Sequence, residues 1–256
     1  MPPLLVDYHI HALGHDHFRH AEEDTPRFLQ TALERGIAEV GFADHDRYHE
    51  LYDFVFLRSL QPRFPRVKIR IGVEVDFHPG EEARWSRFLA GYPLDYAIGS
   101  VHDLGDWTFD HPNNVRGYDR WDPDELYRAY FLTVQAAVRS RLFSLIGHLD
   151  LIKVFGHRSR APAVALAEET LRLLADHDQC IEINTNGWHK PVGEVYPSRE
   201  ILRRCFELNI PITLSSDAHE PGAVGRDVAR AAELAREVGY RRIATFEEKK
   251  RRLVEL

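Results

Sequence analysis

Apolar, strand-like segments alternate with helix-like segments along the whole chain, and this order limits the fold to the α/β classes. Short β-prone runs predict strands that begin at residue 4 and then cover residues 37–43, 67–75, 95–101, 142–147, 179–184, 210–215 and 243–246. The segments between them predict helices at residues 24–36, 51–60, 81–90, 122–141, 161–176, 197–208 and 224–238, with the basic C-terminal stretch also helical. Residues 103–121 are expected to form an irregular loop.

No internal repeat or linker divides residues 1–256, so we expect a single domain. Roughly seven or eight β–α units predict a closed parallel barrel with the helices outside. In such barrels the chemistry lies at the C-terminal ends of the strands. A doubly wound open sheet is the alternative, but it would not bring the ends of so many strands to one point.

Histidines and carboxylates follow the predicted strands at their carboxyl ends. His9 and His11 are two residues apart on the first strand, so both side chains point to the same face. Taken singly, each such histidine is more often structural than a ligand, but this set shares one end of the predicted barrel. The set consists of His9, His11, His45, Glu74, His102, His148, Asp217 and His219. Five histidines in helix or loop settings are instead expected at the surface: His20, His49, His78, His157 and His177.

The ligand types in this set predict a site for several metal ions. Imidazoles and carboxylates without sulfur suit Zn, Mn or Fe. Clustered cations also explain how one pocket can contain so many of the 15 histidines together with acids, because each ion compensates for the desolvation of its ligands.

Charge and composition limit which binding partners and which cellular compartment we expect. The formal net charge of -7 argues against tight non-specific binding to nucleic acid, although it does not exclude a metal-dependent nuclease. The two cysteines, Cys180 and Cys205, form no C-x-x-C motif and indicate no disulfide framework. Met1-Pro2-Pro3 leads directly into the first strand, which leaves no room for a signal peptide. No apolar run approaches the ~20 residues that cross a bilayer. We therefore expect a cytoplasmic protein without membrane partners; the oligomeric state stays open.

Six motifs together resemble those of the polymerase and histidinol phosphatase (PHP) superfamily, in order and from one end of the chain to the other. They are Asp7-x-His9-x-His11, Ala43-Asp44-His45, Gly72-Val73-Glu74-Val75-Asp76, Gly99-Ser100-Val101-His102, Gly147-His148-x-Asp150 and Ser216-Asp217-Ala218-His219. The segments 98–102, 107–112, 184–187 and 196–198 are similar to the histidinol-phosphate phosphatase branch in particular. The resemblance implies a distorted (βα)7 TIM-like barrel that holds two to three divalent metal ions at the C-terminal ends of its strands.

The resemblance also implies a division of the ligands among three ions. The first ion would be held by His9, His11, Glu74 and Asp217. Glu74 would bridge to a second ion held by His102 and His148. The third would take His17, His45 and His219, with His15 as a close competitor of His17. We interpret four nearby acids as groups that orient histidines: Asp7, Asp44, Asp46 and Asp150.

The resemblance implies hydrolysis of L-histidinol phosphate to L-histidinol and phosphate, a small phosphate ester. A hydroxide that bridges two ions would attack phosphorus, with Glu74, Asp217 and His219 as the catalytic residues. Positions near the strand ends supply the expected phosphate contacts, which are Lys153, His189, Lys190 and Arg226. His189 departs from the arginine expected in many relatives. The aromatic side chains expected around the imidazole end of the substrate are Trp107 and Phe109, with Trp188 as a further candidate.

Two other functions compete with this hypothesis. A nuclease acting on phosphodiesters or nucleic-acid ends would need a basic groove, which the net charge disfavours. A non-catalytic metal-storage or regulatory protein is disfavoured by the complete ligand sets, because a decayed site would have lost ligands.

Overall fold

The computed structural model describes residues 4–256; Met1 to Pro3, on which the expectation of no signal peptide rests, lie outside the described residues. The strands are β1 (Leu5–Ile10), β2 (Ile37–Phe42), β3 (Lys68–Ile71), β4 (Glu74–Asp76), β5 (Ile98–Ser100), β6 (Asp103–Leu104), β7 (Trp107–Thr108), β8 (Leu145–Ile146), β9 (Cys180–Asn184), β10 (Ile212–Ser215), β11 (Arg242–Glu247) and β12 (Lys250–Glu255). The α-helices are α1 (Thr25–Glu34), α2 (Phe54–Ser59), α3 (Glu82–Gly91), α4 (Pro123–Ser140), α5 (Ala163–Asp176), α6 (Arg199–Glu207) and α7 (Val228–Val238). Short 3₁₀ helices are η1 (Asp46–Leu51), η2 (Pro112–Arg120), η3 (Leu151–Lys153), η4 (Thr185–His189) and η5 (Pro221–Ala223).

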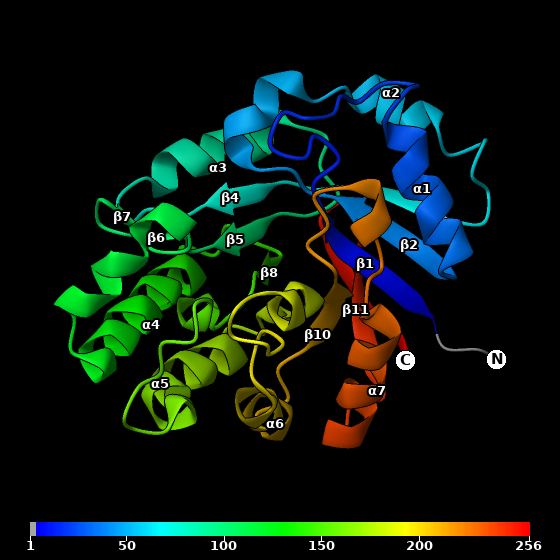
Figure 1. Cartoon of the computed structure of the whole chain (residues 1–256). Coiled ribbons are helices and arrows are strands. Elements are labelled where there is room, and N and C mark those ends of the chain that lie inside the picture. Colours follow the sequence, from blue (N-terminus) through cyan, green and yellow to red (C-terminus); the bar gives the residue numbers. More distant parts are fainter. Residues whose placement is uncertain (1–3) are drawn as a thin grey trace.

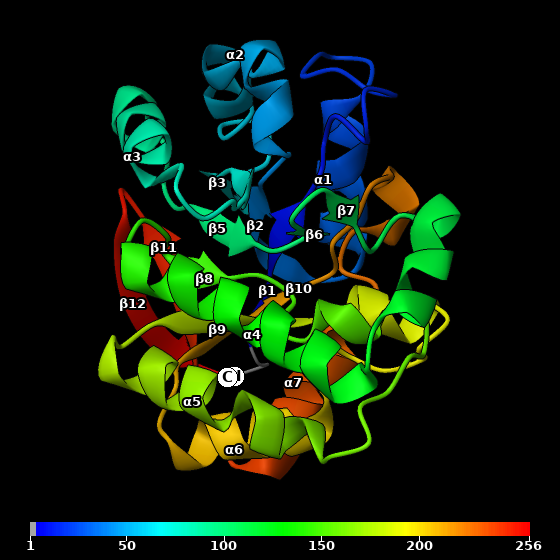
Figure 2. The same ribbon diagram turned by 90° about the vertical axis from the view of Figure 1, so that its left-hand side faces the viewer.

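Parallel strands form the centre of the molecule, which confirms the predicted α/β class. Strands β1, β2 and β3 make one parallel sheet, and β10, β9, β8, β5 and β4 make another in that order. Helices α1 to α3 lie on one side of the strands and α4 to α7 on the opposite side (Figures 1 and 2). No helix within residues 4–256 is both long enough and apolar enough to cross a membrane.

The two sheets meet along both of their edges. At one edge the predicted strand 67–75 is interrupted after Ile71, and the chain continues into β4; the Glu74 amide donates to the Asp44 carbonyl at 3.0 Å. At the other edge the His11 amide donates to the Ala218 carbonyl at 2.7 Å, which joins the end of β1 to the segment after β10. These bonds bring the carboxyl ends of strands from both sheets together.

The predicted helix at the C-terminus is wrong. The chain instead forms an antiparallel hairpin of β11 and β12. Its two connecting residues, Glu248 and Lys249, have φ values of 48° and 62°. Two consecutive residues with positive φ make the type of tight turn that matches the twist of a hairpin. The segment 103–121, expected to be irregular, contains the short hairpin β6–β7 and the helix η2.

A buried polar network attaches the C-terminal hairpin to β1, β2 and β3. The Tyr8 hydroxyl donates to the Glu39 carboxylate and accepts the Phe246 amide at 2.8 Å. The Arg70 Nε donates to Glu39 at 2.8 Å, and its Nη1 donates to Glu247 at 2.6 Å. Because Tyr8 and Glu39 are buried, each polar atom in this network needs a partner inside the protein.

We expect Tyr8→Phe to lower the free energy of unfolding by about 1–3 kcal/mol, because it leaves a buried carboxylate oxygen and the Phe246 amide without this partner. Urea unfolding measures the difference. Tyr92→Phe is a suitable control, because within residues 4–256 the Tyr92 hydroxyl makes no side-chain hydrogen bond. Equal unfolding free energies for the two variants would contradict the role given to the network.

Candidate metal centre

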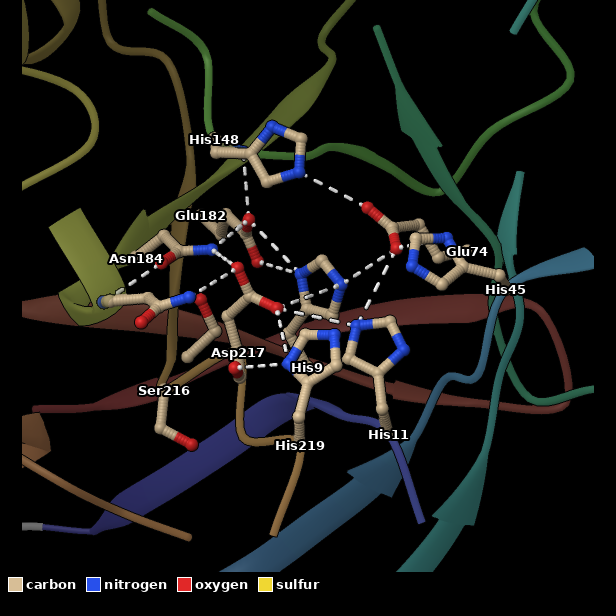
Figure 3. A network of polar contacts seen from close by, with 12 residues as sticks. His9, His11, His45, Glu74, His148, Glu182, Asn184, Ser216, Asp217 and His219 are labelled. Carbon is tan, nitrogen blue, oxygen red and sulfur yellow. Dashed lines mark hydrogen bonds and ion pairs between the residues drawn. The ribbon is translucent and has the colours of Figure 1, made fainter. Parts of the chain in front are cut away.

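His9, His11, Glu74 and Asp217 converge at the ends of β1, β4 and β10. Figure 3 shows the two imidazole rings between the two carboxylates. The Nε2 atoms of His9 and His11 lie 3.3 and 3.5 Å from Glu74 Oε2. The same two nitrogens lie 4.0 and 3.3 Å from Asp217 Oδ1. Four donor atoms from three strands therefore face a common point.

The spacing of these four donors fits a metal ion. Ligands about 2.1 Å from a zinc ion at the corners of a tetrahedron lie roughly 3.4 Å apart. In addition, His9 Nε2, His11 Nε2 and Glu74 Oε2 are buried without a hydrogen-bond partner in the described structure. Buried polar atoms are rarely left unpaired, so three that converge on one point indicate a bound cation.

A second cluster of donors surrounds the other oxygen of Glu74. Glu74 Oε1 lies 3.1 Å from His148 Nε2 and 3.5 Å from His102 Nε2, and these two nitrogens are 3.2 Å apart. Asp76 Oδ1 lies 2.7 Å from His102 Nδ1, which turns Nε2 toward the cluster. We did not assign a role to Asp76 from the sequence. Its position two residues after Glu74 on the same strand is the signal that would have identified it.

A third cluster contains His11, His45 and His219. The structure places His15 beside this cluster, with its ring 4.2 Å from that of His219 and 5.5 Å from that of His45. His17 is exposed and has no aromatic contact within the described residues. The reason is local, because Gly14, His15 and Asp16 all have positive φ and turn the loop back over the site.

Electrostatics hold Glu74 and His11 in the forms that bind metals. Burial alone would raise the pKa of Glu74, but His9, His45 and His102 lower it well below its usual value. Burial, assisted by the nearby His219, lowers the pKa of His11 well below its usual value. Ionised carboxylates and neutral imidazoles are the ligand forms that metal ions require.

Behind the donors, three alternating residues of β9 and η4 form a polar ladder that the sequence analysis missed. Glu182 contacts the His9 ring, with Oε2 3.0 Å from Nδ1. Asn184 and Asn186 donate their side-chain amides to Asp217 Oδ2 at 3.3 and 3.2 Å. They leave Asp217 Oδ1 free to face the histidines. The spacing of two in Glu-Ile-Asn-Thr-Asn was a detectable signal, because it puts polar side chains on one face of a buried strand.

The four acids expected to orient histidines act mainly on the backbone. Asp7 accepts the amides of Ser216 and Gly225 at 2.8 and 2.7 Å. Asp46 accepts the Asp76 amide at 3.3 Å. The expectation that these two acids orient ligand rings is therefore wrong, and they hold the backbone around the site.

The other two acids are also engaged away from the three clusters. Asp44 lies 3.2 Å from His20 Nε2 and accepts the Leu13 amide at 2.7 Å. His20 is buried, so its predicted surface position is wrong. Asp150 pairs with Lys153 at 2.8 Å instead of with a histidine. The remaining histidines expected at the surface are half-buried: His49, His78, His157 and His177.

A cavity of about 460 Å³ lies over the three clusters, and Lys190 lines it as expected. Among the described residues, the other lysine or arginine lining this cavity is Arg47, which was not predicted. Arg47 is held by Asp76 at 2.9 Å. His189 does not line the cavity and pairs with Asp227 at 2.6 Å.

Several expected substrate contacts face elsewhere. Lys153 is buried and donates to the Val195 carbonyl at 2.9 Å while it pairs with Asp150, so it does not line the cavity. Arg226 donates to Asn186 at 3.3 Å and is also outside the lining.

The aromatic wall expected around the substrate is also misplaced. Phe109 is fully buried in the core, with its ring 5.6 Å from that of Tyr130. Trp107 packs on Tyr118, with ring centres 4.9 Å apart. The cavity is instead lined by their polar neighbours, which include Thr108, Asp110 and His111. Trp188, the further candidate, lines a different surface cavity.

Parallel α/β structure with histidine and carboxylate clusters at its strand ends defines a class of proteins whose centre fits divalent metal ions. The sequence model of the PHP domain matches residues 7–186, and the chain belongs to this family.

The relatives extend over nearly the whole chain. The probable histidinol-phosphatase of Deinococcus radiodurans is 40% identical over 96% of this chain and 98% of its own length. The histidinol-phosphatase of Lactococcus lactis is 28% identical over 94% of each chain. The crystal structure of the Lactococcus lactis histidinol phosphate phosphatase, complexed with zinc, L-histidinol and phosphate, has a TM-score of 0.78 at 24% identity and covers 97% of this chain and 98% of that one. The similarity to this structure supports the observed fold.

We expect Glu74→Gln to lower the metal content by more than one ion per chain, because the two oxygens of Glu74 face donors of separate clusters. Elemental analysis of the purified variant, with circular dichroism to check its fold, measures the loss. Glu233→Gln is the matched control, because Glu233 is exposed on α7. Full metal content in folded Glu74→Gln would remove Glu74 from the centre.

The third cluster provides a test that separates two neighbouring histidines. His15→Ala should lower the metal content by at most one ion per chain, because its ring lies closest to those of His219 and His45, and farther, at 6.2 Å, from that of His11, which is also a donor of the first cluster. His17→Ala should leave the metal content unchanged, because within the described residues His17 neither lines the cavity nor contacts a ring of the cluster, whereas His15 does both. Elemental analysis of both variants side by side decides between them, and the opposite pattern would restore His17 as the ligand.

Proposed function

We propose that this chain is a metal-dependent phosphatase that hydrolyses L-histidinol phosphate to L-histidinol and phosphate. The observation that carries the proposal is the Glu74 carboxylate, which faces two separate donor clusters with its two oxygens at the base of the cavity. Identity of 40% to a probable histidinol-phosphatase over 96% of the chain supports the choice of substrate.

We infer that the two sheets form one distorted barrel of seven strands, in which β3 and β4 count as a single interrupted strand. The backbone bonds at both sheet edges support this arrangement. We further propose that residues 1–256 act as a single catalytic domain, because donors from β1 and from the segment after β10 share one cluster.

The proposed centre holds two to three divalent ions, of Zn, Mn or Fe. His9, His11, Glu74 and Asp217 would hold the first. The second would be held by Glu74, His102 and His148, and the third by His11 or His15 with His45 and His219. Bound ions would supply Lewis-acid stabilisation of the phosphoryl group and would lower the pKa of water toward ~7.

The residues of the chain bind and orient the ester in this proposal. Arg47 and Lys190 line the cavity and supply positive charge for the phosphate. Asp217 keeps Oδ1 directed at the first donor cluster, because Asn184 and Asn186 occupy Oδ2.

The charges around the cavity favour a small zwitterionic ester over a nucleic acid. Asp103 and Asp110 line the same cavity as the two cations. A substrate with an ammonium group and a phosphate group can pair with both signs of charge. A polyanionic nucleic acid would be repelled by these carboxylates, and it would need a basic surface instead.

A small ester panel with and without a chelator tests the proposed function. L-Histidinol phosphate should have a higher kcat/KM than p-nitrophenyl phosphate and than the p-nitrophenyl ester of thymidine 5′-phosphate. Removal of the ions should abolish hydrolysis of all three, and adding Zn or Mn back should restore it. Preference for the diester would favour the nuclease function. Hydrolysis that persists after complete metal removal would refute the proposed chemistry.

A further inference from the structure

Glu182 is a fully buried carboxylate in the middle of β9. Removing an ionised carboxylate from water costs several kcal/mol unless the protein supplies partners. Glu182 has three such partners: the His9 ring, the His148 backbone amide and the Asn184 side chain. His9 belongs to the first donor cluster and His148 to the second, so Glu182 contacts residues of both clusters.

The first contact determines which nitrogen of His9 faces the proposed ion. Glu182 Oε2 and Oε1 lie 3.0 and 3.2 Å from His9 Nδ1, so Nδ1 carries the hydrogen that donates to them. The lone pair of His9 is therefore on Nε2, which faces Glu74 Oε2 at 3.3 Å. A carboxylate behind a ligating histidine fixes the tautomer and the ring orientation in this way.

The second contact fixes the backbone that carries His148. Glu182 Oε1 accepts the His148 amide at 2.7 Å. The His148 ring then extends to Glu74 Oε1, 3.1 Å from its Nε2. One buried carboxylate therefore holds a ligand of the first cluster through its ring and a ligand of the second cluster through its main chain (Figure 3).

We propose that Glu182 is a positioning residue that couples the first and second metal sites, so that its loss weakens the binding of both ions together. The inference rests on the metal centre of the proposed function. The next polar residues along the ladder differ from Glu182, because Asn184 and Asn186 contact Asp217, a donor of the first site alone.

Glu182→Gln tests this coupling with the smallest change in shape. The amide oxygen can replace Oε1 and accept the His148 and Asn184 donors. The amide NH₂ group then faces the N–H of His9 Nδ1, and two hydrogen-bond donors meet. The His9 ring must therefore turn, which moves Nε2 away from Glu74, or change tautomer, which places the hydrogen on Nε2 and removes its lone pair. Zn²⁺ affinities measured by chelator competition should fall about 10- to 100-fold for the two tightest ions. The visible spectrum of the Co²⁺-loaded protein should change as well, because it reports the number and type of ligands.

Two comparison variants sharpen the result. Asn186→Ala should weaken one of the two tight ions, because Asp217 is the one proposed ligand that it releases, together with the Arg226 guanidinium, which is not a ligand. Glu233→Gln, on the exposed face of α7, should leave all affinities and the Co²⁺ spectrum unchanged. A general loss of stability would instead affect all sites and would lower the unfolding free energy of the metal-free protein.

The outcomes separate this inference from the proposed function. If the wild-type chain binds none of Zn²⁺, Mn²⁺ and Fe²⁺, both are overturned. If the wild type binds Zn²⁺ and Glu182→Gln binds two ions with wild-type affinity, the inference fails and the proposed function stands. Should Glu182→Gln not fold, Glu182→Asp keeps the buried charge but withdraws it from His9. Weaker binding is expected there too, and unchanged affinities would overturn the inference.

Discussion

The structure around the site depends on one buried carboxylate, that of Glu74, and on the imidazoles that surround it. Each of its oxygens lies within 3.5 Å of histidine nitrogens from other strands. Burial opposes ionisation of Glu74, and the imidazoles reverse this effect and hold its pKa well below the usual value. The imidazole nitrogens whose lone pairs would serve as ligands also face one another, as in the contact of 3.2 Å between Nε2 of His102 and Nε2 of His148. Divalent ions at these points would satisfy the carboxylate and the lone pairs together.

This arrangement follows from the alternation of side chains along a β-strand, in which every second residue points to the same face. It places His9 and His11 on one face of β1, Glu74 and Asp76 on one face of β4, and Glu182 and Asn184 on one face of β9. The parallel order of the strands then brings the carboxyl ends to the same side. In β4 and β9, one residue of each pair contacts the Nδ1 atom of a proposed metal ligand from another strand: Asp76 contacts His102, and Glu182 contacts His9. Strand β4 therefore supplies both a donor and a group that orients another donor, whereas β9 supplies orienting groups.

The sequence allowed the strand-end donors to be predicted but not the residues on the loops. Donors such as His102 and His148 follow directly from strand positions, and the structure brings them within contact distance. Lys153 and Phe109 lie beyond strand ends, where direction depends on tertiary partners: the buried Asp150 attracts the lysine, and the core takes the phenylalanine. His15 and His17 differ in position because of three positive φ values, which no short pattern in the sequence encodes. Glu182 was not predicted, because the role of an acid inside an apolar strand cannot be assigned before its partner on β1, His9, is known.

Charge explains how an acidic chain can bind an anionic ester. The net charge is -7, and the cavity itself contains the carboxylates of Glu74, Asp76, Asp103, Asp110 and Asp217. Arg47 and Lys190 do not balance these acids, and Arg47 is already paired with Asp76. The metal-free cavity would therefore repel a phosphate, whereas two or three divalent ions would reverse the sign of its base. The carboxylates of Asp103 and Asp110, which line the same cavity, would repel polyanions. In this arrangement the ions determine whether phosphate binds, and the protein's own carboxylates determine which phosphate ester can enter.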